Sequence, residues 1–228
     1  MTLVLLPGMD GSGSLFADFV SVVKAKTVVV SYPPDSPMGY SEIEAFVRGS
    51  LPDGSPFILV GESFSGPVAI ALASSGLVGL RAVVLVCTFA KYPGSEFLRL
   101  LGRFPVPLWR LPIQLVSFVL LGRFGSASWR ARLLDAMRRV MPAVWRVRLR
   151  AVLEVDVTQR LSKISVPLLY LRASEDRVVS SSASAVVLRH HPKAQVVALE
   201  GPHFLLQAKP QEAAAAIRAF AHESGIAL

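Results

Sequence analysis

The chain has 228 residues, of which 52% are hydrophobic and 18% charged. This length suffices for one compact domain with a sizeable core, and the composition excludes extended disorder. The formal net charge of +8 favours anionic substrates, partners or surfaces. Cys87 is the single cysteine, which excludes an internal disulfide and a cysteine pair for a metal.

The mean hydropathy of +0.50 raises the question of a membrane span. The most apolar runs, 3–6, 57–60, 67–90 and 111–121, are each short or interrupted by Gly, Pro, Ser or Arg. A spanning helix needs about 20 uninterrupted apolar residues, so these runs predict buried strands and their covering helices. The chain opens directly on a strand pattern, without a basic segment before it, so we expect no secretory signal and a cytoplasmic location.

Short, apolar, mostly β-branched runs alternate with longer helical patterns along the chain. The predicted strands are 3–6, 27–30, 57–60, 83–86, 168–171 and 195–198. The predicted helices are 14–25, 40–49, 64–75, 180–190 and 210–222. Continuous apolar strands are typical of a sheet buried on both faces. The alternation therefore predicts an α/β fold with a mostly parallel, doubly wound sheet of about six strands.

The segment 91–160 interrupts this alternation with helical pieces, several prolines and few acidic residues. Its arginines are Arg99, Arg103, Arg110, Arg123, Arg130, Arg132, Arg138, Arg139, Arg146, Arg148, Arg150 and Arg160. We predict a core made of 1–90 and 161–228, with 91–160 inserted as a helical cap or lid over one end of the sheet.

The segment 57–67, Phe-Ile-Leu-Val-Gly-Glu-Ser-Phe-Ser-Gly-Pro, predicts a strand, a sharp turn at Ser63 and a helix. A nucleophilic serine needs this arrangement, because the turn raises the hydroxyl above the sheet and the helix N-terminus faces developing negative charge. Gly61 and Ser65 are small, as such a tight turn requires. Ser65 stands where the G-x-S-x-G pattern has glycine, so the match is imperfect. A turn of small residues without chemistry is the alternative.

A glycine-rich loop, Pro7-Gly-Met-Asp-Gly-Ser-Gly13, follows the first predicted strand. In a serine hydrolase such a loop supplies one backbone amide of an oxyanion hole, and the residue after the nucleophile supplies the other. Those amides belong to Met9 and Phe64. A phosphate-binding loop is the alternative, but its spacing and its lysine are missing. Asp10 is expected to fix a turn in the loop.

Among the four histidines, His203 stands between the last predicted strand and the last predicted helix. Loops at the carboxyl ends of parallel strands are where such sheets place their sites, so His203 is the candidate base. His190 and His191 end a predicted helix, where imidazoles are common polar residues. His222 lies near the C-terminus.

A third residue is needed to orient the imidazole and to stabilise its charged form. Asp176 follows the strand 168–171 and precedes His203, which gives the order Ser, Asp, His. Glu175 is its direct neighbour and remains a rival for this place. Asp156 and Glu154 precede the strand and are expected at a helix cap or on the surface.

With these residues in place, the sequence resembles the α/β-hydrolase superfamily from Leu3 to the final helix. Pro7-Gly8 resembles the family's oxyanion loop, although the histidine often found before that glycine is absent. The stretch 201–212 resembles the family's histidine loop and closing helix. The form Leu-Pro-Gly-Met-Asp-Gly-Ser-Gly is similar to a small bacterial subgroup of serine esterases and acyl-transfer enzymes. The resemblance implies a minimal sheet that lacks the first strands of the eight-stranded plan.

The resemblance implies a carboxylesterase that acts on short-to-medium acyl chains. His203 would take the proton of Ser63, Asp176 would hold His203, and an acyl-enzyme would form without any metal or organic cofactor. Two alternatives stay open. The same triad serves a thioesterase or acyltransferase that acts on acyl thioesters or lipids, and an idle module of this fold binds a lipid or a partner.

The substrate is expected to contact the cap 91–160. The apolar side chains of Phe104, Trp109 and Phe118 predict an acyl-binding surface, or else they pack the cap onto the sheet. The arginines form a solvated face, or they contact anionic lipid or an acidic acyl carrier. No recognition motif accompanies them, so we expect no nucleic-acid binding.

Overall fold

The computed structural model describes residues 1–94 and 111–228. In this part of the chain, six strands form one sheet in the order β2-β1-β3-β4-β5-β6, and all neighbours pair in parallel. The strands are β1 (Thr2–Leu6), β2 (Lys26–Val29), β3 (Phe57–Glu62), β4 (Leu80–Val86), β5 (Leu168–Ala173) and β6 (Gln195–Leu199). Each overlaps a predicted strand, so the predicted parallel α/β sheet is confirmed.

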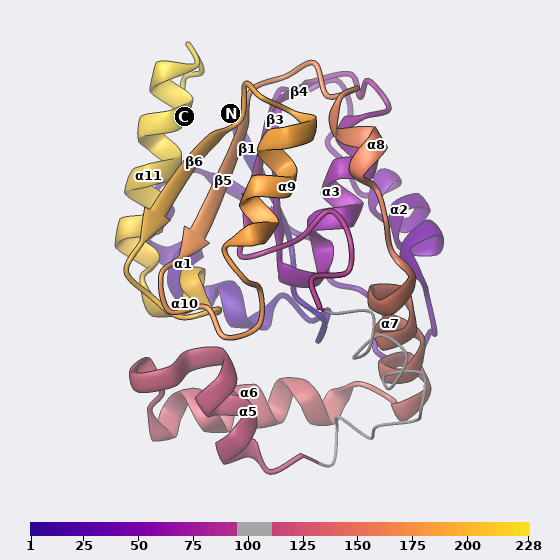
Figure 1. Cartoon of the computed structure of the whole chain (residues 1–228), viewed down its shortest axis with the longest axis vertical. Coiled ribbons are helices and arrows are strands. Elements are labelled where there is room, and N and C mark those ends of the chain that lie inside the picture. The colour runs from indigo at the N-terminus through magenta and orange to yellow at the C-terminus, as the bar shows by residue number, and fades with distance from the viewer. Residues whose placement is uncertain (95–110) are drawn as a thin grey trace.

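Helices cover both faces of this sheet (Figure 1). One face carries α1 (Ala17–Val23), α10 (Leu205–Ala208) and α11 (Pro210–Glu223). The other carries α2 (Tyr40–Arg48), α3 (Gly66–Ala73), α8 (Thr158–Leu161) and α9 (Ser182–His190). The helices predicted at 14–25 and 64–75 each begin with a 3-10 turn, η1 (Ser14–Phe16) and η2 (Ser63–Ser65) respectively.

The core has two apolar layers because successive strand residues point to opposite faces. In β3, Ile58 and Val60 join the layer under α1 and α11, and Phe57 and Leu59 join the layer under α2 and α3. All four are at most 1% exposed. Burying one such side chain contributes about 1.5–3 kcal/mol, which explains why the central strands are apolar throughout.

Between β4 and β5, the described chain forms a helical segment on the side to which the arrowheads of β5 and β6 point (Figure 1). It consists of α5 (Ile113–Leu121), η4 (Gly122–Phe124), α6 (Ala127–Arg139) and α7 (Pro142–Glu154). A separate apolar cluster joins it to the loops at the strand ends: Leu15, Leu121, Leu133, Ala136, Met137, Val140, Val144, Trp145 and Phe204. This segment therefore packs against the carboxyl side of the sheet.

Among residues 1–94 and 111–228, no helix has the length and apolar character needed to cross a bilayer. The apolar run 111–121 becomes α5, a helix of 9 residues. The run 67–90 is divided between α3 and β4.

Candidate active site

Ser63 occupies a sharp turn between β3 and α3. Its backbone φ is 49°, in the left-handed region, which costs a non-glycine residue about 1–2 kcal/mol. The chain passes close to itself here, since a Cβ on Gly61 would stand 2.7 Å from the Cβ of Ala69. The hydroxyl of Thr88 donates a hydrogen bond to the Ser63 carbonyl. The turn predicted at Ser63 is therefore present, and a bond from the loop after β4 holds it.

Ser63, His203 and Asp176 form a continuous hydrogen-bonded chain. Ser63 Oγ lies 2.8 Å from His203 Nε2, and His203 Nδ1 lies 2.9 Å from Asp176 Oδ2. Because a carboxylate only accepts, Nδ1 carries the imidazole proton and Nε2 accepts from the Ser63 hydroxyl. The side chains of His203 and Asp176 are only 2% and 5% exposed. The contacts between these groups are therefore shielded from bulk water.

The loop after β5 directs its two acidic residues differently. Asp176 Oδ1 accepts hydrogen bonds from the amides of Val178 and Val179, both at 2.8 Å. Those two bonds orient the carboxylate, and His203 Nδ1 lies 3.0 Å from Oδ1 and 2.9 Å from Oδ2. The carboxylate of Glu175 lies instead 2.7 Å from the guanidinium of Arg123. Of the two rivals, the fold thus brings Asp176 to the histidine.

The glycine-rich loop after β1 is closed by local hydrogen bonds. The amide of Gly11 donates to the carbonyl of Gly8 at 3.0 Å. Asp10 Oδ2 accepts from the amide of Ser12 at 3.0 Å and from its hydroxyl at 2.6 Å. Asp10 therefore fixes a turn, as predicted, and Met9 lies inside that turn.

Ser65 links this loop to the turn at Ser63. Its hydroxyl donates to the carbonyl of Pro7 and accepts from the Tyr32 hydroxyl, with the two oxygens 2.6 Å apart. Ser65 and Tyr32 are 0% and 2% exposed. The departure from the glycine of the usual motif thus has a physical role, because glycine has no hydroxyl to make these two bonds.

Glu62 and Gln207 form a buried polar pair that the sequence reasoning missed. Glu62 precedes Ser63 and is 3% exposed. The pKa of its carboxyl is raised to about 8: burial is the main cause, the hydrogen bond from Gln207 opposes the shift, and the charge of Asp10 adds to it. Gln207 Nε2 donates to Glu62 Oε2 at 3.1 Å, and Glu62 Oε1 is buried without a partner. Glu62 stood beside the candidate nucleophile in the sequence, but only packing shows its burial.

Of the three remaining candidates, only Phe118 lies within the described residues. Phe118, in α5, is 58% exposed, and its ring centroid lies 4.2 Å from the guanidinium carbon of Arg177. Phe104 and Trp109 lie outside the described residues, so their place in an acyl-binding surface stays a prediction. In the described ranges, no group of three or more His, Cys, Asp and Glu side chains is placed to hold a metal ion.

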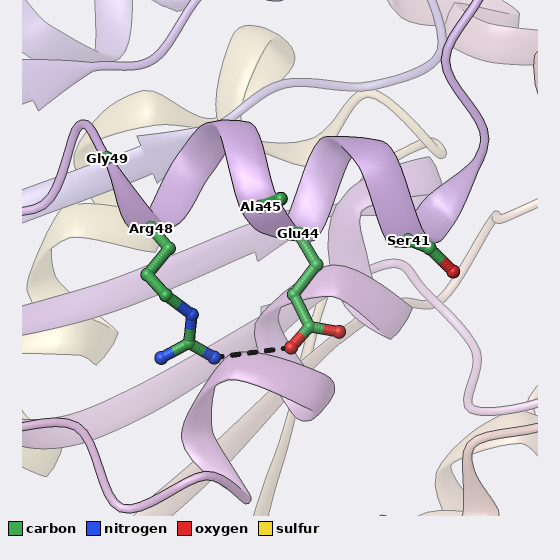
Figure 2. A pocket seen from close by; sticks show the side chains of 5 residues that line it. All are labelled: Ser41, Glu44, Ala45, Arg48 and Gly49. Carbon is green, nitrogen blue, oxygen red and sulfur yellow. Dashed lines mark hydrogen bonds and ion pairs between the residues drawn. The ribbon is translucent and has the colours of Figure 1, made fainter.

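A surface hollow on α2 is distinct from this site (Figure 2). It is lined by Ser41, Glu44, Ala45, Arg48 and Gly49. Arg48 Nη2 lies 3.3 Å from Glu44 Oε1, and the other carboxylate oxygen lies 3.3 Å from the guanidinium of Arg160. Because the Glu44 carboxylate is already paired with both guanidiniums, we assign no ligand to the hollow.

Comparison with known proteins gives the family. The pattern of the alpha/beta hydrolase family matches residues 3–216, and the chain belongs to this family. No curated protein matches the sequence.

Several solved structures share the fold at low identity. A bromoperoxidase from Bacillus anthracis is 16% identical, with a TM-score of 0.83 over 97% of this chain and 91% of that one. A lipase-esterase related protein from Clostridium acetobutylicum is 15% identical, with a TM-score of 0.78 over 96% and 93%. An enol-lactonase from Burkholderia xenovorans is 16% identical, with a TM-score of 0.76 over 97% and 91%. These likenesses concern the fold alone.

Proposed function

We propose that this protein is a serine hydrolase that cleaves carboxylic esters of short-to-medium acyl chains. The observation that carries the proposal is the hydrogen-bonded chain from Asp176 through His203 to Ser63. It provides a nucleophile, a base and a group that orients the base. An idle binding module has no need of this arrangement, nor of a strained φ at Ser63.

In the proposed reaction, His203 Nε2 removes the hydroxyl proton as Ser63 Oγ attacks the acyl carbonyl carbon. Asp176 stabilises the imidazolium, and the amides of Met9 and Phe64 bind the oxyanion, each worth about 3–4 kcal/mol. His203 then gives its proton to the departing alkoxide, which leaves an acyl ester on Ser63. Water attacks this ester with His203 again as base, His203 returns the proton to Ser63 Oγ, and the carboxylic acid leaves.

We also propose that 91–160 is a cap over a core made of 1–90 and 161–228. Its helices α5, α6 and α7 lie on the side of the carboxyl ends of the strands, and α6 and α7 contribute most of the apolar cluster shared with Leu15 and Phe204. That burial favours a packing role for their apolar residues. Leu115 and Phe118 in α5 stay 48% and 58% exposed, and they remain available to an acyl chain.

The function is tested by the hydrolysis of p-nitrophenyl esters from acetate to palmitate. Wild type should cleave them with an optimum at one chain length, and S63A should lose the activity because the nucleophile is gone. Wild type inactive on every ester would contradict the esterase and favour acyl thioesters. Equal activity of S63A would show that another group is the nucleophile.

The acid is tested in the same assay with a matched pair of variants. D176N removes the charge that orients His203 and should lower kcat about 10⁴-fold. E175Q, one residue away but paired with Arg123, should keep kcat within about threefold, as expected for an exposed ion pair. The reverse order of effects would assign the acid to Glu175.

A further inference from the structure

Arg148 is a fully buried cation on a helix whose neighbouring arginines are exposed. It projects from α7 and is 0% exposed, whereas Arg146 and Arg150 of the same helix face solvent. Its guanidinium donates to backbone carbonyls, with Nη1 2.9 Å from the Met9 oxygen and 3.0 Å from the Asp10 oxygen. Arg148 thus reaches from the helical segment into the loop after β1.

This burial is costly and stability alone does not explain it. A buried charge is usually held by a directly bonded carboxylate, but the hydrogen-bond partners described for Arg148 are carbonyl oxygens, with Pro33 as the third at 3.2 Å. The ring centroid of Tyr32 lies 5.6 Å from its guanidinium carbon. Burial lowers the pKa of Arg148 while the nearby Asp10 opposes that shift, and Nε is buried without a partner. An apolar side chain of similar volume would fill the space without these costs.

The loop is shaped around the guanidinium. Gly11 has a φ of +73°, and a Cβ there would stand 2.6 Å from Arg148 Nη1. Two consecutive carbonyls, of Met9 and Asp10, are bound by the same nitrogen. The planar guanidinium therefore fixes the backbone on the carboxyl side of Met9. On the amino side, the Gly8 carbonyl is held by the Gly11 amide at 3.0 Å.

We propose that Arg148 is a positioning residue, which holds the loop of Met9 in the arrangement needed to receive an oxyanion. The proposal rests on the proposed function and adds a residue that touches neither the substrate nor the triad. When the loop is held in place, its amide donor need not move as the oxyanion forms, so no free energy is lost to rearranging the loop. Loss of Arg148 should therefore slow the chemical step more than it weakens ester binding.

The test compares R148M, which removes the donors and the charge but keeps an apolar stem, with R146M as the exposed control on the same helix. Since small misplacements of catalytic groups cost up to about 100-fold, R148M should lower kcat about 10- to 100-fold on the best p-nitrophenyl ester. Its KM should stay within about threefold. Its thermal midpoint should fall below that of wild type, because the carbonyls of Met9, Asp10 and Pro33 lose their donor. R146M should match wild type. A wild-type kcat in folded R148M would overturn the proposal.

Two further measurements cover the other outcomes. If R148M does not fold, R148K replaces it: one ammonium cannot serve three carbonyls as the guanidinium does, so kcat should fall at least about fivefold. Wild-type kcat in R148K would then overturn the proposal.

Hydrogen exchange of the peptide that covers 7–13 should be faster in either variant. This readout does not depend on activity. If wild type hydrolyses no ester, faster exchange still supports positioning while the esterase fails, and unchanged exchange rejects the positioning role.

Discussion

Glu62 and Ser63 are adjacent in the chain, but their side chains meet different surroundings. The Ser63 hydroxyl faces His203 at hydrogen-bonding distance, whereas the Glu62 carboxyl is enclosed with one oxygen unpaired. Burial raises the pKa of Glu62 to about 8, so the neutral acid predominates near pH 7. A neutral Glu62 adds no negative charge beside the place where an oxyanion would form.

This titration predicts a pH dependence of stability. Glu62 ionises with an ordinary pKa of 4.5 when unfolded and of about 8 when folded, so between these values the folded state holds more protons. The contribution of Glu62 to the free energy of unfolding is complete below pH 4.5 and is lost as pH rises through 8. E62Q does not titrate, and its unfolding free energy relative to wild type should therefore increase with pH.

Urea unfolding between about pH 5 and 9 measures this difference. The exposed residue Glu212 supplies the control, since E212Q should follow the wild-type curve across the range. A constant offset between E62Q and wild type at all pH values would show that folding does not shift the pKa of Glu62.

At the scale of elements, the site is assembled by loops that follow neighbouring strands. β1 lies between β2 and β3, so the loop after β1 meets both Tyr32, which comes after β2, and Ser65, which comes after β3. The Tyr32 hydroxyl, the Ser65 hydroxyl and the Pro7 carbonyl form one buried hydrogen-bonded series. This series ties the predicted oxyanion loop to the turn that carries Ser63.

S65A should therefore destabilise the protein by about 1–3 kcal/mol, because it leaves a buried hydroxyl and a buried carbonyl unpaired. Chemical denaturation measures the loss, with S21A, on the exposed face of α1, as the control. The double variant Y32F/S65A should lose less than the sum of the two single variants. Strict additivity would indicate that Tyr32 and Ser65 do not share this bond.

At the scale of the whole molecule, arginines are concentrated in the proposed cap. Residues 111–160 hold nine arginines and three acidic residues. Four of these arginines belong to α6, which lies beyond the carboxyl ends of β5 and β6 (Figure 1). A field of one sign at the mouth of a site raises the rate of encounter with oppositely charged substrates, and salt screens it.

We expect this field to favour anionic acyl substrates. The kcat/KM for the p-nitrophenyl monoester of a dicarboxylic acid should fall several-fold when ionic strength rises from about 0.01 M to 0.3 M, since the Debye length shrinks from about 30 Å to less than 8 Å. The neutral p-nitrophenyl ester of the same chain length is the matched control and should change little. Equal salt dependence of the two esters would mean that the arginines do not steer substrate.

Local patterns in the sequence are sufficient to predict much of the fold. The central strands are apolar because they are buried on both faces, and this appears directly as runs such as 57–60 and 83–86. The turn at Ser63 and the loop of His203 are likewise short motifs, whose spacing is set by the geometry of one strand and one helix. The parallel topology that the alternation predicted puts both at the carboxyl edge of the sheet, and the tertiary structure brings Ser63 Oγ to 2.8 Å from His203 Nε2.

Other features depend on contacts between distant segments, and no local pattern encodes them. Asp176 and Glu175 are neighbours of like charge. The amides of Val178 and Val179 orient the Asp176 carboxylate, whereas the Glu175 carboxylate forms an ion pair with Arg123. The raised pKa of Glu62 comes from burial, which is a property of the packed core.

Arg148 shows most clearly the difference between what the sequence determines and what the tertiary structure determines. In the sequence it is one of many arginines in 91–160, and the pattern favours a solvated face for such a run. The sequence by itself determined the strands, the turn at Ser63 and the histidine loop, because each is set by residues close together along the chain. Only the tertiary structure decided that Arg148 is buried against the Met9 and Asp10 carbonyls, because that contact joins residues about 140 positions apart through the packing of α7 on the sheet.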